Sequence, residues 1–144
     1  MLDSQRNYVL RSVEERGVRL VRLWFTDVLG NLKSLAISPA ELENALEDGM
    51  TFDGSSIDGF SRVQEADMLA RPDAASFQVL PNKEGVARMF CNIVTPDGDS
   101  FDGDPRSVLQ RNLDRAAELG FSFYVGPEVE YFYFEDSGPE PKAL

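Results

Sequence analysis

Four short apolar runs, joined in pairs by brief turns, limit the possible fold more than any other feature of the sequence. The first pair is RLVRLWFTD (19–27) and LKSLAI (32–37), and the second is FQVLP (77–81) and VARMFCNIV (86–94). Branched and aromatic residues favour strands, and a short glycine-containing connection between two strands predicts a hairpin. The runs therefore predict two hairpins within one mixed sheet.

Capping signals predict a helix on either side of the first hairpin. The earlier helix covers residues 4–16 and ends at Gly17, where a left-handed C-cap is favoured. The later helix runs from Ser38 to about Glu47. It begins with the pattern of a capping box, since a proline follows the serine and a glutamate lies three residues on. Helices combined with hairpins in this way predict an α+β fold.

A further helix and strand follow a turn-rich stretch. TPDGDSFDGD (95–104) is rich in glycine and aspartate and is the best candidate for a domain boundary. Asp104 is expected to cap a helix that has Pro105 at its first position. FSFYVGPEVEYFYF (121–134) then predicts a long apolar strand. The expected inner face of the helix consists of Val108, Leu109, Leu113, Ala116 and Ala117. Because a lone helix and strand cannot close a core, we expect the chain to stop inside a second domain.

Charge and residue usage exclude several classes of function. With 25 acidic and 14 basic residues the formal net charge is −11, which disfavours nucleic acid and anionic membranes as partners. No apolar run approaches the roughly 20 residues of a membrane span, and the first residues do not resemble a secretory signal. The absence of histidine excludes histidine-based zinc sites and triads from this chain. The single cysteine, Cys91, is expected to be a buried thiol, and a cytoplasmic location is expected.

The first pattern with possible chemistry is Glu128-Val129-Glu130. Side chains two apart on a strand point to one face, so both carboxylates would emerge together. The opposite face would be apolar, so the strand would be buried on at least one side. Adjacent carboxylates near a core are costly unless they are paired or bind a metal, and their oxygens suit Mg²⁺ or Mn²⁺. The alternative is an edge strand whose glutamates face water.

The second pattern is the segment DGSSIDGF (53–60), which begins at Asp53. Its glycines, serines and aspartates predict a tight loop with exposed backbone N–H groups, and its position after a helix makes it a candidate binding loop. It lacks the pattern of a phosphate-binding P-loop. The alternative is an ordinary surface turn, which favours the same residues.

Five segments, matching in order and spacing, resemble the type I bacterial glutamine synthetases. They are FTDVLG (25–30), FDGSSIDGF (52–60), EADMLARPD (65–73), FDGDPRSVLQRNL (101–113) and GPEVEYFYF (126–134). With Arg62 shortly after the loop, the sequence is most similar to the branch of this family found in Gram-positive bacteria. The resemblance implies a β-grasp-like amino-terminal domain over residues 1–103. It further implies the first helix and strand of an incomplete catalytic domain over residues 104–144.

The resemblance also implies roles for individual residues. Glu128 and Glu130 match metal ligands of the family, which would hold Mg²⁺ or Mn²⁺. Asp53 matches a catalytic aspartate that reaches into the neighbouring subunit's site, binds ammonium and helps to remove its proton. Because the family's active site lies between subunits of a dodecamer, self-association is implied.

Four further residues match positions near the same site. Ser56 is expected to support the loop, and Asp67 matches a second acid near the ammonium pocket. Phe60 occupies a position close to the nucleotide. Arg62 matches a position tied to feedback inhibition by glutamine.

The implied reaction joins ammonia to L-glutamate through γ-glutamyl phosphate, consumes ATP and gives glutamine, ADP and phosphate. Phosphoryl transfer depends on positioning and on neutralising the transferring oxygens, a task for divalent metals. Two alternatives stay open: a paralogue that couples glutamate to a polyamine or to ethanolamine, and a truncated interface module without catalysis. The 144 residues alone are expected to be inactive, because two carboxylates cannot fill a metal's coordination shell.

Overall fold

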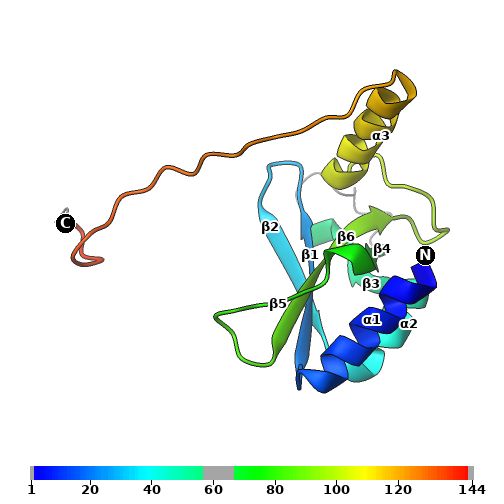
Figure 1. Cartoon of the computed structure of the whole chain (residues 1–144), viewed down its shortest axis with the longest axis horizontal. Helices are drawn as coiled ribbons and strands as arrows, with labels where there is room; N and C mark the ends of the chain where they lie inside the picture. Colours follow the sequence, from blue (N-terminus) through cyan, green and yellow to red (C-terminus); the bar gives the residue numbers. More distant parts are fainter. Residues whose placement is uncertain (1, 57–66, 143–144) are drawn as a thin grey trace.

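A six-stranded mixed sheet forms the centre of the molecule in the computed structural model, which describes residues 2–56 and 67–142 (Figure 1). The strand order is β2-β1-β6-β4-β3, and the short β5 pairs with β6 beside this path. Strands β1 and β6 run parallel and all other pairs are antiparallel. The strands are β1 (Leu20–Thr26), β2 (Leu32–Ile37), β3 (Met50–Asp53), β4 (Asp67–Pro72), β5 (Gln78–Val79) and β6 (Val86–Val94).

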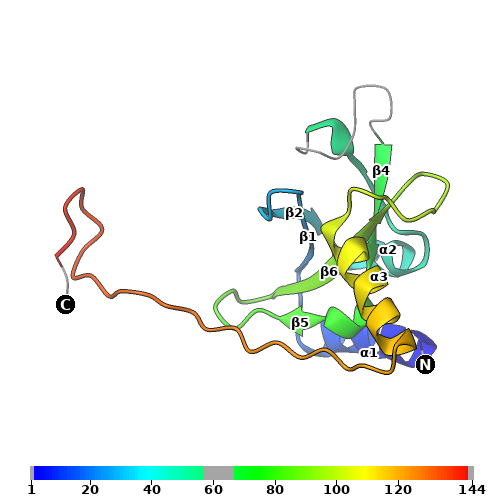
Figure 2. The same cartoon turned by 90° about the horizontal axis from the view of Figure 1, so that it is seen from above.

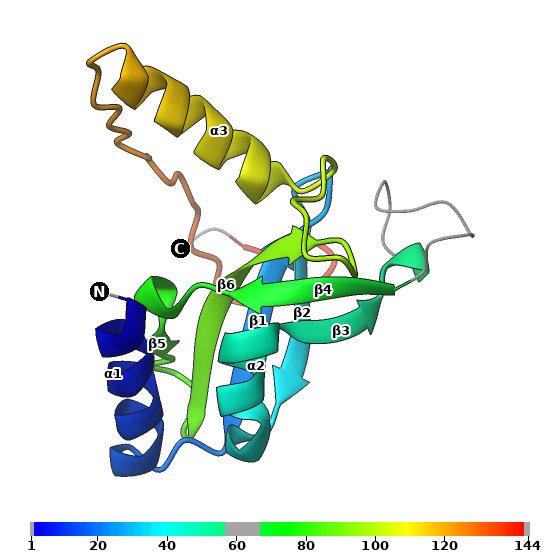
Figure 3. The same cartoon turned by 90° about the vertical axis from the view of Figure 1, so that its right-hand side faces the viewer.

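Two helices, α1 (Leu2–Glu15) and α2 (Leu42–Asp48), lie side by side on one face of the sheet (Figure 3). Alternation in β1 and β6 directs every second side chain towards these helices, as expected for a sheet with one buried face. Leu23 and Met89 are fully buried at the centre of this layer. The core comprises Val9, Val13, Val18, Val21, Leu23, Phe25, Ile37, Leu42, Ala45, Met68, Ala70, Ala87, Met89, Cys91 and Ile93. The sequence thus correctly predicts the α+β class, both hairpins and the buried cysteine.

The expected capping box before α2 does not form. The chain first makes a 3-10 turn over Pro39–Glu41. The side chain of Ser38 makes no capping hydrogen bond. The backbone instead closes this turn, with Glu41 N donating to Ser38 O at 3.1 Å. The end of the helix agrees with the sequence, because Gly49 has a φ of +85°, a conformation that favours glycine.

Strands β3 and β4 have no counterpart in the sequence-based prediction. They pair antiparallel with each other, and β4 also pairs with β6, which places this hairpin at one edge of the sheet. Phe52 and Met68 face the core while their neighbours along each strand face outwards. Two strands therefore flank residues 57–66, which lie outside the described residues.

Helix α3 (Pro105–Glu118) begins as predicted, but its expected inner face is largely exposed. The side chain of Asp104 accepts hydrogen bonds from the backbone of Arg106 and Ser107. By contrast, Val108 and Leu109 are 41% and 56% exposed, and the described residues that are buried at this end of the chain are Asp104 and Ser107 at the start of the helix. Within the described residues, no helix is both long enough and apolar enough to cross a membrane.

The segment after α3 is not the strand that the sequence predicts. Residues 121–133 form no regular structure and extend away from the sheet (Figures 1 and 2). Their side chains are exposed, with Tyr124 at 88% and Phe132 at 84%. The residue types favour a strand, but a strand also requires a hydrogen-bonded neighbour, and the described part of the chain offers none to this segment.

Candidate functional site

The two acids at the loop-side end of the β3–β4 hairpin define the candidate site. Asp53 is the last residue of β3 and Asp67 the first of β4, and the antiparallel register pairs them directly. Because Phe52 and Met68 occupy the core side, both acids lie on the outward face, where they are exposed. Directly opposed like charges repel, which makes the pair a favourable position for a cation.

The Asp53 carboxylate is oriented by the turn that follows it. Oδ1 accepts hydrogen bonds from the Ser55 backbone N at 2.9 Å and from Ser55 Oγ at 2.6 Å. These two bonds, the hydroxyl contributing most, lower the pKa of Asp53 below its ordinary value and outweigh a small opposing effect of desolvation. The carboxylate is therefore ionised at neutral pH and held in one orientation at the end of the strand.

The other expected loop residues are only partly described. Ser56 ends the 3-10 turn Gly54–Ser56 that directly follows β3, so it lies next to the acid pair along the chain. Phe60 and Arg62 lie outside the described residues. The structure thus brings together Asp53 and Asp67, and it leaves the expectations for the nucleotide-proximal and feedback positions as they stand.

Glu128 and Glu130 do not lie on a sheet. Both are exposed in the extended segment that follows α3, so the expectation of a strand buried on one side is wrong for this chain. Figure 1 shows this segment leading away from the domain that carries Asp53 and Asp67. Among the described residues, no group of three or more potential metal-ligating His, Cys, Asp or Glu side chains occurs. The oxygen donors of the two glutamates suit Mg²⁺ or Mn²⁺ in kind, but they are too few for a complete coordination shell.

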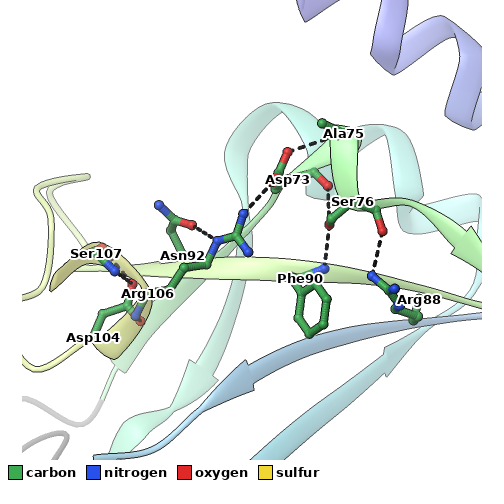
Figure 4. Close-up of polar contacts among 9 residues, drawn as sticks. All are labelled: Asp73, Ala75, Ser76, Arg88, Phe90, Asn92, Asp104, Arg106 and Ser107. Carbon is green, nitrogen blue, oxygen red and sulfur yellow. Dashed lines mark hydrogen bonds and ion pairs between the residues drawn. The ribbon is translucent and has the colours of Figure 1, made fainter. Parts of the chain in front are cut away.

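A partly buried polar network that the sequence-based prediction did not include lies where α3 meets the sheet (Figure 4). Arg106 Nε donates to Asn92 Oδ1 at 2.7 Å, and Arg106 Nη2 donates to Asp73 Oδ2. Asp104 is fully buried and accepts from Ile93 N at 3.1 Å. Only the capping role of Asp104 could be read from the sequence, because the other contacts join residues that are distant along the chain.

Two consecutive parts of the chain match one protein family. Residues 17–96 match the family described as glutamine synthetase, beta-Grasp domain, and residues 102–143 match glutamine synthetase, catalytic domain. The chain belongs to the glutamine synthetase family. The expected α+β fold agrees with the mixed sheet and its helices, and the β-grasp match lies in the amino-terminal part of the chain.

Curated glutamine synthetases align with nearly the whole chain. The enzyme of Mycobacterium bovis is 58% identical over 148 residues, which cover 99% of this chain and 33% of that protein. The enzyme of Mycolicibacterium smegmatis is 55% identical and that of Clostridium saccharobutylicum 48% identical, covering 97% and 94% of this chain and 34% and 31% of those proteins. These relatives fit the expected Gram-positive branch. The chain spans about a third of their length.

Solved structures of similar proteins have the same fold. A structure described as a GmaS/ADP complex has a TM-score of 0.73 at 27% identity, and it covers 77% of this chain and 26% of that one. The cryo-EM structure of Plasmodium falciparum glutamine synthetase has a TM-score of 0.72 at 22% identity, and it covers 80% of this chain and 23% of that one. The second likeness concerns the fold alone.

Proposed function

We propose that this chain is the amino-terminal third of a glutamate–ammonia ligase that forms glutamine from ammonia and L-glutamate through γ-glutamyl phosphate, with release of ADP and phosphate. The observation that carries the proposal is the pairing of Asp53 with Asp67 at the tip of a β-grasp hairpin in a member of the glutamine synthetase family. The protein would serve glutamine biosynthesis and nitrogen metabolism. A cytoplasmic location belongs to the same proposal.

Asp53 and Asp67 would receive ammonium. Their opposed negative charges attract a small cation, and the lowered pKa keeps the Asp53 carboxylate ionised. When the nitrogen attacks the acyl phosphate its protons become more acidic, and Asp53 would accept one as a general base. Ser55 would keep the accepting oxygen in a fixed direction through its two hydrogen bonds. Ser56 would support this loop, with Phe60 near the nucleotide and Arg62 at a feedback position.

Glu128 and Glu130 would each anchor one divalent cation, Mg²⁺ or Mn²⁺, on the catalytic side of the site. Such cations neutralise the transferring phosphoryl oxygens of ATP. The similar GmaS structure is described as a complex with ADP, which supports a nucleotide as a ligand of the proposed site. The two glutamates are exposed in this chain, so further ligands from the rest of the enzyme would complete each shell.

Domain division and assembly complete the proposal. A β-grasp domain over residues 1–103 would be followed by the first part of the catalytic domain over residues 104–144. The Asp53 loop would complete the active site of a neighbouring subunit, in a dodecamer of the full-length protein.

Steady-state phosphate release by the full-length enzyme tests the function. We expect turnover with ammonium and glutamate, and a loss of about 100-fold or more in kcat/KM for ammonium in Asp53→Asn. Asp97→Asn, which removes the same charge from an exposed turn, is the control and should behave as the wild type. A preference for a polyamine or ethanolamine over ammonium would overturn the proposal in favour of the amine-ligase paralogue. Ligase turnover by the 144 residues alone would contradict the expected need for the rest of the protein.

A further inference from the structure

The junction between the two family-matched segments is anchored to the sheet by a buried carboxylate. Asp104 is fully buried, and its Oδ2 accepts hydrogen bonds from Ile93 N at 3.1 Å, Ser107 N at 3.2 Å and Ser107 Oγ at 2.7 Å. One of these donors belongs to strand β6 and two belong to the first turn of α3. A buried carboxylate requires such partners, so the loss of the donors from either element while Asp104 stays buried would be costly. The cap therefore also fastens α3 to β6.

Arg106 forms a second link between the same elements (Figure 4). Its Nε donates to Asn92 Oδ1 at 2.7 Å, while Nη2 pairs with Asp73 Oδ2. Its guanidinium also lies 5.9 Å from the centroid of the Phe90 ring. A planar guanidinium can hold two acceptors in fixed directions at once, which a lysine ammonium on a flexible stem cannot do equally well. One side chain of α3 thus contacts β6 and the turn after β4.

The acceptor Asp73 is itself held in place. Its backbone O accepts from Ser76 Oγ at 2.7 Å, and Ser76 Oγ accepts from Phe90 N at 2.8 Å. Its Oδ1 accepts from Ala75 N at 3.0 Å, which caps the 3-10 turn Ala74–Ser76. Arg106 therefore pairs with a rigid acceptor on the sheet, and not with a mobile surface acid.

From this geometry we infer that Arg106 is a positioning residue that makes α3 one rigid unit with the β-grasp sheet. The junction near residue 104 is then a boundary in sequence and not a hinge. The rest of α3 is largely exposed, so its direction depends on the contacts of its first turn. In terms of the proposed function, on which this last step rests, Arg106 fixes where the segment that carries Glu128 and Glu130 begins relative to the β-grasp sheet.

A distance measurement between the sheet and α3 tests the rigid link directly. Spin labels would be placed at the exposed positions Ala36 on β2 and Ala117 on α3, as A36C and A117C in the 144-residue chain. The native Cys91 is fully buried and should escape labelling. We expect one narrow distance distribution, which broadens in Arg106→Lys and in Asp73→Asn. Arg111→Lys, an exposed substitution on the same helix, should leave the distribution narrow. An unchanged width in both Arg106→Lys and Asp73→Asn would overturn the inference.

Hydrogen exchange separates a positioning role from a general loss of structure. In Arg106→Lys the amides of α3 should exchange about tenfold faster or more, while those of β1 and β6 keep their protection. Equal loss of protection in α3 and in the sheet would show that Arg106 only stabilises the fold, and would also overturn the inference.

Kinetics of the full-length enzyme provide the functional readout. Arg106→Lys should raise the KM for the divalent metal several-fold, and kcat should fall less than the metal KM rises. Arg111→Lys should change neither. An unchanged metal KM in an active Arg106→Lys enzyme would refute the link to the glutamate segment. If the wild type lacks ligase activity, the proposed function fails, while the distance and exchange measurements still decide whether the junction is rigid.

Discussion

Asp53 and Asp67 face each other across the antiparallel pair of β3 and β4, so two exposed carboxylates share one position at the edge of the sheet. This arrangement works against the stability of the hairpin, because directly opposed like charges are unfavourable. Such a local conflict is common where a site serves function, in line with the role proposed for the two acids.

Removing one of these charges should separate stability from function. Asp67→Asn should raise the Tm of the chain by about 2 °C, because the repulsion from Asp53 is relieved. In the full-length enzyme the same change should raise the KM for ammonium by about tenfold or more. Thermal unfolding and steady-state kinetics measure the two effects. Asp97→Asn, which removes an exposed acid elsewhere, should show neither effect, and a lower Tm for Asp67→Asn would contradict the repulsion.

Ser55 should determine the pH at which Asp53 becomes protonated. Its hydroxyl and backbone hydrogen bonds lower the pKa of Asp53, so Ser55→Ala should return this pKa towards the ordinary value of 3.8. The stability that follows from the lowered pKa is present above the unfolded-state value and is lost as the pH falls through the folded-state value. Carboxyl-carbon NMR titration of the chain measures the shift. A pKa for Asp53 that is identical in wild type and Ser55→Ala would show that another group controls it.

The buried Asp27 in the turn between β1 and β2 should contribute to acid unfolding. Burial acts to raise its pKa, but hydrogen bonds from Asn31, Lys33 and Leu29 outweigh this and hold the pKa below 3.8. Its contribution is therefore complete above that value and is lost as the pH falls through the lower, folded-state value. We expect Asp27→Asn to lower the Tm by roughly 5 °C at neutral pH and to flatten the dependence on pH below 4. Urea unfolding as a function of pH provides the check, with Asp97→Asn as the charge-matched control.

Cys91 should behave as a core residue without thiol reactivity. Burial raises its pKa to about 12, so thiolate is scarce at pH 8 and reagents cannot reach the sulfur. In the folded chain, labelling by a thiol reagent should be at least about 100-fold slower than in urea. Ser34→Cys, an exposed position on β2, should label rapidly and serves as the control. Rapid labelling of native Cys91 would contradict its burial.

The parts of the fold that the sequence predicts are those that depend on local pattern. Alternating apolar residues in β1 and β6 are sufficient to identify these strands, and Gly49 marks the end of α2 through its positive φ. Strands β3 and β4 were missed because they are short and carry polar residues such as Thr51 and Arg71. Strand β4 forms by pairing with β6 through Ala70 and its neighbours, and β3 forms by pairing with β4; both pairings are tertiary information.

The site was predictable in its residue types but not in its arrangement. The resemblance to the family selected Asp53 and Asp67, and only the register of the hairpin shows that they are direct partners. The predicted buried strand around Glu128 does not form, because residues that favour a strand form one only beside a hydrogen-bonding neighbour, which the described residues do not place there. The roles of Glu128, Glu130, Phe60 and Arg62 stay predictions.

The parallel pairing of β1 with β6 has a consequence for synthesis on the ribosome. Leu20 cannot meet its partner Val86 until the chain beyond β6 has left the exit tunnel, whereas β1 and β2 can associate much earlier. Nascent chains should therefore hold an unprotected hairpin that presents Leu23 and Phe25 to chaperones for most of translation of this domain. The sheet can form completely only after β6 has left the tunnel, because β6 pairs with β1, β4 and β5. Slow codons placed after β6 would therefore give the sheet time to form.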